Sequence, residues 1–301
     1  MGKHKRLKKL KRRIVFYRAI VFVCGTLVLV GIYYYILDRA GIIENFSKGN
    51  YYFSYFNAEI YLAVLIGFAV YAGFYFPLRK PIEKTKEEIH KTFIMDACSE
   101  IFENVQHSFE PGLNQDLLDN SRLIKKGNIY YSNDLVTASY QGISFQMSDV
   151  LIREECINDV MMSETITIFR GQWFIFKLDY RSTAYLRVSD AVSPVIPREW
   201  EKIELENNVF NDLFHVYASH AEEAKKILTE QAMEKVLEIK SQLKDELVIG
   251  IVGDELHLAI NSNNYLFDYK TWEKSGEPYQ KELISRLRLL VSIVEELDLT
   301  K

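Results

Sequence analysis

Paired carboxylates are the first residues of this chain that could carry chemistry. Glu154 and Glu155 are adjacent, and Glu204 alternates with Glu206 around Leu205. Two neighbouring carboxylates can share acid and base work or bind a cation. Neither pair has further metal-ligating or catalytic residue types close to it in the sequence, so isolated surface acids are the simpler interpretation of both.

Histidines are the next candidates for metal binding or proton transfer. His215 and His220 lie five positions apart, on an expected strand and in the first turn of an expected helix, which points His220 to solvent and disfavours a metal pair. His257 alternates with Leu256 and Leu258, and this pattern predicts that it lies on the polar, exposed face of a sheet.

The cysteines and the tryptophan-centred aromatic run favour structural roles. Cys24, Cys98 and Cys156 form no CxxC pair and have no identifiable histidine partner, which indicates reduced thiols and not a disulfide framework, a zinc site or a nucleophile. Trp173 is flanked by Phe174, and these rings are expected in the core and on the sheet surface, not on a base-stacking platform.

A search for longer motifs predicts no catalytic, cofactor-binding or metal-binding residue. The chain contains no GxGxxG, Walker A, HExxH, GxSxG or EF-hand pattern. Gly250 and Gly253 lie on a strand leading into a tight turn, which is the wrong context for a phosphate cradle.

Charge is distributed very unevenly along the chain. Eight of the first 13 residues are Lys or Arg, whereas residues 92–301 hold 35 Asp and Glu against 21 Lys and Arg, a difference of −14. A domain this acidic lacks the basic surface that nucleic-acid binding requires. The 48% of hydrophobic residues also excludes global disorder.

Two apolar segments predict a membrane hairpin. Residues 14–37 are 24 residues interrupted only by Arg18, and residues 60–78 are a second uncharged run of 19. Both are long enough to span a hydrocarbon core of about 30 Å as helices. The first run is too long for the apolar region of a cleaved signal and has no small-residue cleavage site after it.

Basic residues at the ends of these segments predict the orientation. Eight Lys and Arg precede the first span, two lie in the loop of residues 38–59, and five follow the second span. By the positive-inside rule, both termini face the cytoplasm of a cell inner membrane. The basic tail of residues 1–13 sets this orientation, and it could also attract anionic lipids.

The remaining residues predict an α+β domain. Apolar positions recur at four- and seven-residue steps over residues 79–111, which predicts an amphipathic stalk helix. Residues 112–301 form the expected cytoplasmic domain, in which an antiparallel sheet carries helices packed on it.

Alternating strands joined by turn residues predict three hairpins. The first turn is Gln141-Gly142, the second is Arg170-Gly171 between residues 165–169 and 173–180, and the third is Gly253-Asp254 in type II′ geometry. A further strand is expected over residues 183–188.

Helices are expected in two places in the C-terminal half. Ser219 to Glu222 fits a capping box, which predicts a helix over residues 221–243 that restarts near Thr229. A closing helix carries Leu283, Leu287 and Leu290.

The residues YQGISFQMSDVLIREE, FRGQWFIFKLDY, FHVYASHAEEAKKILT and VIGIVGDELHLAI resemble the bacterial DUF3137 family. The resemblance extends from Ile14 onward and includes two N-terminal spans. It implies a membrane-anchored domain of unknown function, with no assigned activity, so no functional residue is carried over. It also implies a LemA-type membrane protein as a candidate partner.

These observations favour a non-catalytic, membrane-anchored module that binds or scaffolds another protein from the cytoplasmic side. A membrane-surface enzyme of unrecognised type is the alternative, and a deep cleft with convergent polar groups and perturbed titratable residues would favour it. A channel or transport subunit is a weaker alternative, because only Thr26 and Cys24 are polar near the middle of the spans.

Overall fold

The chain folds into two compact units, residues 1–92 and residues 93–301, and each is described by itself. The computed structural model describes residues 3–39, 58–157, 163–179, 181–191, 196–267 and 277–296, and over most of residues 58–78 it describes the backbone without the side chains. The expected outer loop, residues 38–59, lies almost wholly outside these ranges.

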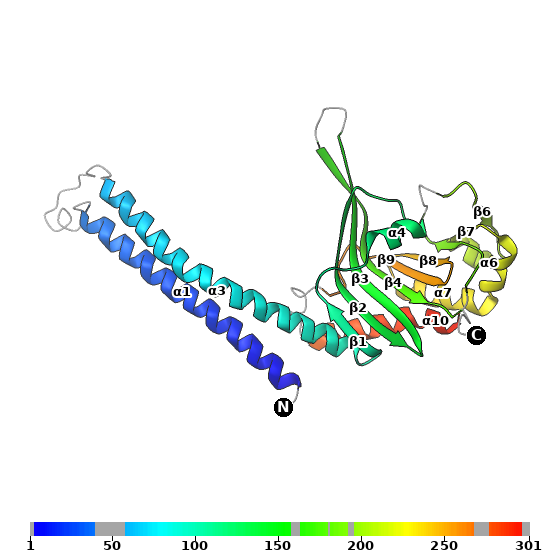
Figure 1. Cartoon of the computed structure of the whole chain (residues 1–301), viewed down its shortest axis with the longest axis horizontal. Helices are drawn as coiled ribbons and strands as arrows, with labels where there is room; N and C mark the ends of the chain where they lie inside the picture. Colours follow the sequence, from blue (N-terminus) through cyan, green and yellow to red (C-terminus); the bar gives the residue numbers. More distant parts are fainter. Residues whose placement is uncertain are drawn as a thin grey trace. The chain divides into compact units, whose positions relative to one another are not determined.

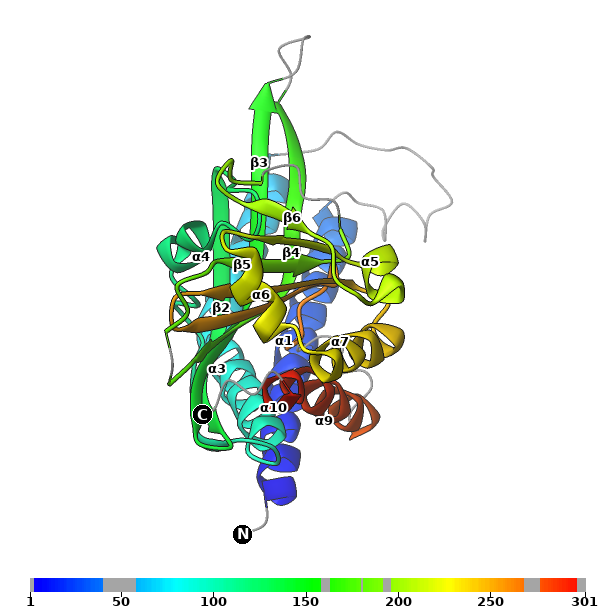
Figure 2. The ribbon, with the colours of Figure 1, turned by 90° about the vertical axis from the view of Figure 1, so that its right-hand side faces the viewer.

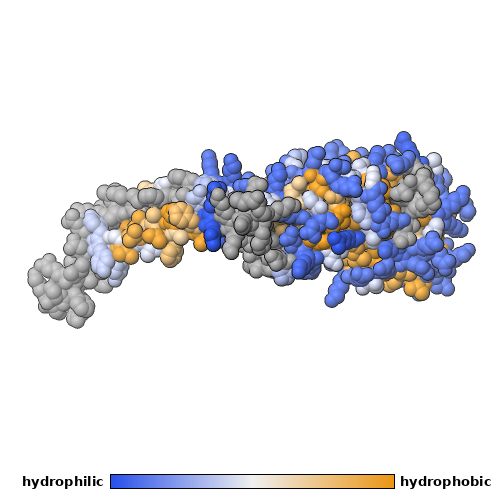
Figure 3. Space-filling model, turned by 90° about the horizontal axis from the view of Figure 1, so that it is seen from below, coloured by the Kyte–Doolittle hydropathy of each residue, from blue (hydrophilic) through white to orange (hydrophobic). Residues whose placement is uncertain are grey.

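The first unit contains α1 (Lys3–Arg39) and most of α3 (Ala58–Cys98) (Figure 1). Within α1, Arg12–Tyr35 is a 24-residue apolar stretch, and few of its residues are buried. The Thr26 hydroxyl in this stretch donates to the Phe22 carbonyl at 2.8 Å, so this polar group is hydrogen-bonded within the helix. Figure 3 shows the stretch as a hydrophobic band next to a hydrophilic end.

Among the described residues, α1 is the one helix long and apolar enough to cross a membrane, and an N-terminal signal sequence would pass the same test. The predicted second span, residues 60–78, is helical and forms part of α3. Most of its side chains lie outside the described part of the structure. Only one of the two predicted spans is therefore found.

The prediction of a stalk helix over residues 79–111 is wrong for the last part of that range. α3 continues through Pro77 and Pro81 but ends at Cys98, and residues 103–108 form β1 (Glu103–Ser108). The apolar residues Ile101, Val105 and Phe109 suggested a helix because they are four apart. Four is also an even number, so the same spacing keeps side chains on one face of a strand.

The described residues of the second unit form a nine-stranded sheet in the order β1-β2-β3-β4-β9-β8-β5-β7-β6 (Figure 1). Every neighbouring pair is antiparallel, as the alternating pattern predicts. After β1, the strands are β2 (Ile129–Tyr140), β3 (Ile143–Ile157), β4 (Ser163–Lys177), β5 (Leu186–Ser189), β6 (Glu201–Ile203), β7 (His215–Ala218), β8 (Glu246–Val252) and β9 (Glu255–Asn261).

Two of the three predicted hairpins are confirmed. β2 and β3 meet at Gln141-Gly142, and β8 and β9 meet at Gly253-Asp254, where Gly253 alone has a positive φ of 64°, as a type II′ turn requires. The predicted turn at Arg170-Gly171 is wrong, because β4 runs straight through it. A Cβ at Gly171 would lie 1.9 Å from the Ile260 carbonyl oxygen, so glycine here permits a close approach of β9.

Both faces of the sheet are buried at its centre. One face carries Trp173, Val248 and Ala259 in an apolar cluster covered by Leu113 and Leu118, the latter on α4 (Gln115–Ser121); we call it the Trp173 face. The other face, which carries Asp149 and Gln172, is called the helix face. It is covered by α9 (Glu277–Val291), with α7 (Glu230–Gln242) and α10 (Ile293–Glu296) beside it (Figure 2).

The helices of the C-terminal half lie close to their predicted positions, but the first of them is not capped as predicted. α6 (Ala221–Ile227) and α7 are separated at Thr229, whose hydroxyl accepts from the Ala232 amide at 3.2 Å, so the predicted restart is confirmed. The N-cap of α6 is His220 and makes no side-chain cap hydrogen bond, so the predicted capping box is wrong. Ser219 instead accepts from the Tyr185 amide at 2.9 Å. The short helix α5 (Asn208–Leu213) precedes β7.

β3 and β4 extend beyond their neighbours as a two-stranded ribbon (Figure 1). β2 pairs with β3 only as far as Arg153, and β9 pairs with β4 only over residues 172–177. Residues 154–157 of β3 pair with residues 163–166 of β4, and we call these eight residues the ribbon. Ile157 and Ile166 in it are 77% and 49% exposed.

Candidate functional site

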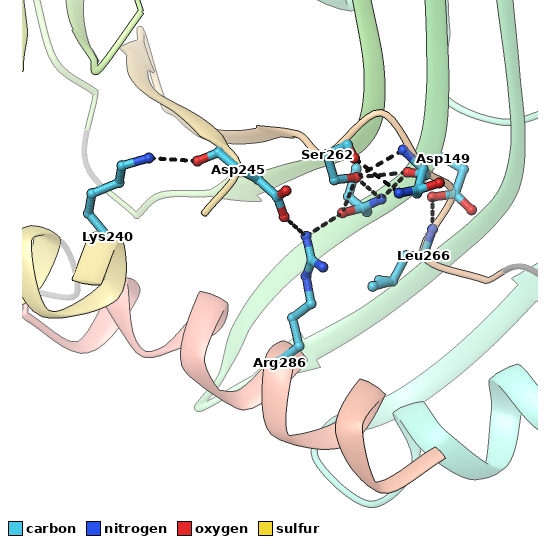
Figure 4. A network of polar contacts seen from close by, with 8 residues as sticks. Asp149, Lys240, Asp245, Ser262, Leu266 and Arg286 are labelled. Atoms are coloured by element: carbon cyan, nitrogen blue, oxygen red, sulfur yellow. Dashed lines mark hydrogen bonds and ion pairs between the residues drawn. The ribbon is translucent and has the colours of Figure 1, made fainter. Parts of the chain in front are cut away.

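A cluster of polar side chains crosses the helix face of the sheet and joins it to α7 and α9 (Figure 4). Asp149 on β3 and Gln172 on β4 are opposite each other in the strand register. The polar cluster is defined as a set of hydrogen-bonded residues together with Asp149, which is opposite Gln172 and accepts from the nearby Leu266 amide. The hydrogen-bonded residues are Gln172, Lys240, Asp245, Ser262, Asn264 and Arg286.

Asp149 is a completely buried carboxyl group. Its two oxygens accept hydrogen bonds from the backbone amides of Leu266, at 2.8 Å, and Phe267, at 3.2 Å. Burial raises the pKa of Asp149 to about 7, against the opposing effect of these amides and of Gln172. The carboxyl therefore fastens the segment after β9 onto β3, and both of its oxygens are already engaged.

Gln172 connects that segment to the helix above it. Its Nε2 donates to the Ser262 hydroxyl at 3.2 Å and to the Asn264 carbonyl at 2.8 Å, while its Oε1 accepts from Arg286 Nη2 at 3.4 Å. A glutamine that is only 2% exposed needs such partners, because an unpaired buried amide would cost about 1 to 3 kcal/mol.

Arg286 holds α9 against the start of β8. Its Nη2 donates to Asp245 Oδ2 at 2.6 Å, and Lys240 on α7 donates to the Asp245 carbonyl at 2.8 Å. Lys240 also forms an ion pair with Asp190. The polar cluster thus ties α7 and α9 to β3, to β4 and to the segments that adjoin β8 and β9, through charged and neutral hydrogen bonds.

A cavity of about 280 Å³ opens beside this cluster. Gln172, Ser262, Asn264 and Arg286 line it together with Tyr279 and Glu282. Tyr279 donates its hydroxyl to the Leu266 carbonyl at 2.8 Å, so its position is fixed. The wall offers one cation, one carboxylate and several neutral polar groups, which suits reversible binding of a small polar molecule.

His257 lies where the sequence did not predict it. It is completely buried on the Trp173 face, because the face that was expected to be polar is covered. Trp173 Nε1 donates to His257 Nδ1 at 3.1 Å, so the ring proton resides on Nε2, 3.5 Å from Glu255 Oε2. This pairing lowers the pKa of Glu255. Trp173 and His257 form a buried hydrogen-bonded pair beside the partly exposed Glu255, and the expectation that Trp173 is a core residue is confirmed.

The remaining histidine and cysteine candidates do not line the cavity beside the polar cluster. His215 is half-buried on β7, and His220 is exposed, as predicted. Cys98 is buried, which raises its pKa to about 12, and Cys156 lies on the ribbon with its thiol 3.7 Å from the Glu164 carbonyl oxygen. Within the described ranges, no group of three His, Cys, Asp or Glu side chains is arranged to hold a metal ion.

The two predicted carboxylate pairs lie in different places. Glu154 forms an ion pair with Lys125 at 2.5 Å, and Glu155 accepts from the Ser163 hydroxyl at 2.5 Å. Glu204 and Glu206 are exposed and line an open cavity of about 580 Å³ together with polar and apolar residues, among them Lys225 and Met233. The structure brings neither pair to the polar cluster.

Sequence reasoning missed Asp149, Gln172 and Arg286. A signal for Asp149 was present, because it continues the inward series of Phe145 and Met147 on an alternating strand, where an acid is out of place. Gln172 was hidden by the turn expected at Gly171. Arg286 lies beside the apolar positions of α9, where one arginine looks like ordinary helix surface.

Comparison with known proteins gives one family and one structural likeness. Residues 167–299 match the family described as "Protein of unknown function (DUF3137)", which confirms the resemblance over that segment. No curated protein matches the chain. The crystal structure of the mycobacterial trehalose monomycolate transport factor A is similar with a TM-score of 0.39 and 10% identity, over 67% of this chain and 93% of that chain.

Proposed function

We propose that this chain, whose residues 167–299 match the DUF3137 family, is a membrane-anchored protein-binding module that works from the cytoplasmic face. The apolar stretch of α1 and its basic N-terminal flank support the anchor and its orientation. Residues 60–78 of α3 supply the second span of the proposed hairpin, so that both termini lie in the cytoplasm.

The observation that carries the binding role is the outer edge of β4 in the ribbon. Glu155 on β3 uses both its backbone N–H and its carbonyl with the Asn128 side chain, each at 2.8 Å. In an antiparallel ladder, its opposite residue Thr165 then directs its own N–H and C=O outward. Over residues 163–169, no described strand pairs with that edge.

An open strand edge is a template for another strand. Soluble proteins usually blunt such edges, and partners that add a strand gain backbone hydrogen bonds along the whole contact. The exposed Ile157 and Ile166 would supply apolar contacts, and the exposed Glu164 favours a partner strand that carries Lys or Arg. The LemA-type membrane protein implied by the family resemblance is the first candidate partner.

The test is site-specific photocrosslinking of the full-length protein in membranes, with the crosslinker at Ile157. We expect one discrete crosslinked protein in the wild type and in the Thr165→Val variant, which keeps the outward N–H. Thr165→Pro removes that N–H without breaking a bond to β3, and it should abolish the product. An unchanged product in Thr165→Pro, or none in the wild type, would overturn strand addition.

The second candidate function is an enzyme at the membrane surface. The cavity of about 280 Å³ beside a carboxyl with a raised pKa favours it. Against it, both oxygens of Asp149 are engaged by backbone amides. A small molecule consumed by the wild-type protein but not by Arg286→Gln would establish the enzyme in place of the binding module.

A further inference from the structure

A second, partly open cavity lies on the Trp173 face, on the opposite side of the sheet from the polar cluster. It is a cavity of about 320 Å³, large enough for a small organic molecule. Its walls are mainly apolar and include Ile124, Ile166, Ile168, Phe169 and Val248.

Arg187 on β5 lines this cavity and is only 2% exposed. Its Nε donates to the Leu123 carbonyl at 2.8 Å, but its Nη1 has no hydrogen-bond partner within the described part of the chain. Burial lowers the pKa of Arg187, yet a guanidinium with an ordinary pKa above about 12 stays protonated at neutral pH. A buried cation with an unused donor is costly unless something pairs with it.

The other charged groups around the cavity already have partners. Lys125 and Glu154 form an ion pair with each other at 2.5 Å. Glu246 accepts from Asn261 Nδ2 at 2.5 Å, and its negative charge, like that of Asp190, also favours the charged form of Arg187. Arg187 is therefore the cation on the wall whose hydrogen-bonding capacity is incompletely used by the described residues.

We propose that this cavity binds a small monocarboxylate with an apolar body, whose carboxylate pairs with the guanidinium of Arg187. A guanidinium presents its donors in a planar fork that matches two carboxylate oxygens, and such charge-assisted bonds are strong where water is excluded. The isoleucine and phenylalanine side chains would surround the apolar body of the ligand. This cavity shares Ile166 with the proposed docking edge of β4, whereas Arg187 lies on β5 and outside that edge.

The experiment is equilibrium dialysis of the full-length protein in detergent with three acids: phenylacetate, 4-methylpentanoate and hexanoate. The primary amide of each acid is the matched neutral probe. We expect at least one acid to bind saturably, one molecule per chain, and at least tenfold more tightly than its amide.

Two variants locate the binding. Arg187→Met removes the cation at similar length and should abolish acid binding. Because this buried change could unfold the protein, Ile166→Trp is the second variant: Ile166 is 49% exposed, and a larger ring there should fill the cavity and weaken binding at least tenfold. Val209→Trp, 61% exposed on α5 and outside the cavity lining, is the control and should bind like the wild type.

Three results would overturn the proposal. They are no saturable binding of any of the three acids, equal binding of an acid and its amide, or binding that is unchanged in the folded Ile166→Trp variant.

Discussion

At the scale of single residues, Asp149 is the group whose ionisation should most affect folding. Its pKa is about 7 in the folded protein and about 3.9 in an unfolded chain, so between these values the folded state binds the proton more tightly. The stability that this proton contributes is complete below pH 4 and is lost as the pH rises through 7. Three pKa units correspond to roughly 4 kcal/mol.

Asp149→Asn should remove this pH dependence. Asparagine stays neutral, so we expect the unfolding free energy of the variant to fall less than that of the wild type between pH 4.5 and pH 7.5. Chemical denaturation of the detergent-solubilised protein at several pH values measures it. Asp212→Asn, at an exposed position on α5, is the control and should keep the wild-type slope. Identical slopes in Asp149→Asn and the wild type would contradict this account of Asp149.

At the scale of elements, local patterns predicted the antiparallel hairpins but not the order of the sheet. Turns at Gly142 and Gly253 depend on neighbouring residues, so the sequence reveals them. The pairing of β4 with β9 joins residues 172–177 to residues 255–260, and no local pattern encodes it. The polar cluster depends on that pairing, which is why Gln172 and Ser262 could not be connected in advance. His257 was misjudged for the same reason, because burial of the Trp173 face requires the distant segment around α4.

Alanine substitutions at Gly142, in the β2–β3 turn, and at Gly171, within β4, should lower the unfolding free energy by very different amounts. Gly142→Ala has open space around the new Cβ, so only the φ of 85° is unfavourable and the cost should be about 1 kcal/mol. Gly171→Ala puts a Cβ 1.9 Å from the Ile260 carbonyl oxygen and must displace β9. We expect it to cost more than about 3 kcal/mol in unfolding free energy. Equal losses in the two variants would contradict the continuous β4.

At the scale of the whole molecule, the N-terminal tail and the C-terminal part of the chain differ in charge. Residues 1–13 are strongly basic, whereas residues 92–301 have a formal charge of −14, from 21 Lys and Arg against 35 Asp and Glu. Anionic phospholipid would attract the first segment and repel the second. Under the proposed function, this repulsion would keep the surface of the acidic domain available for a protein partner.

The membrane anchor is the claim on which the proposed function rests, and alkaline carbonate extraction tests it most directly. The full-length protein, tagged at both ends, is expressed and its membranes are washed with carbonate. We predict that both tags stay in the membrane pellet on one chain of full length. A C-terminal tag released into the supernatant on a chain that has lost its N-terminal tag would identify α1 as a cleaved signal sequence and contradict the anchor.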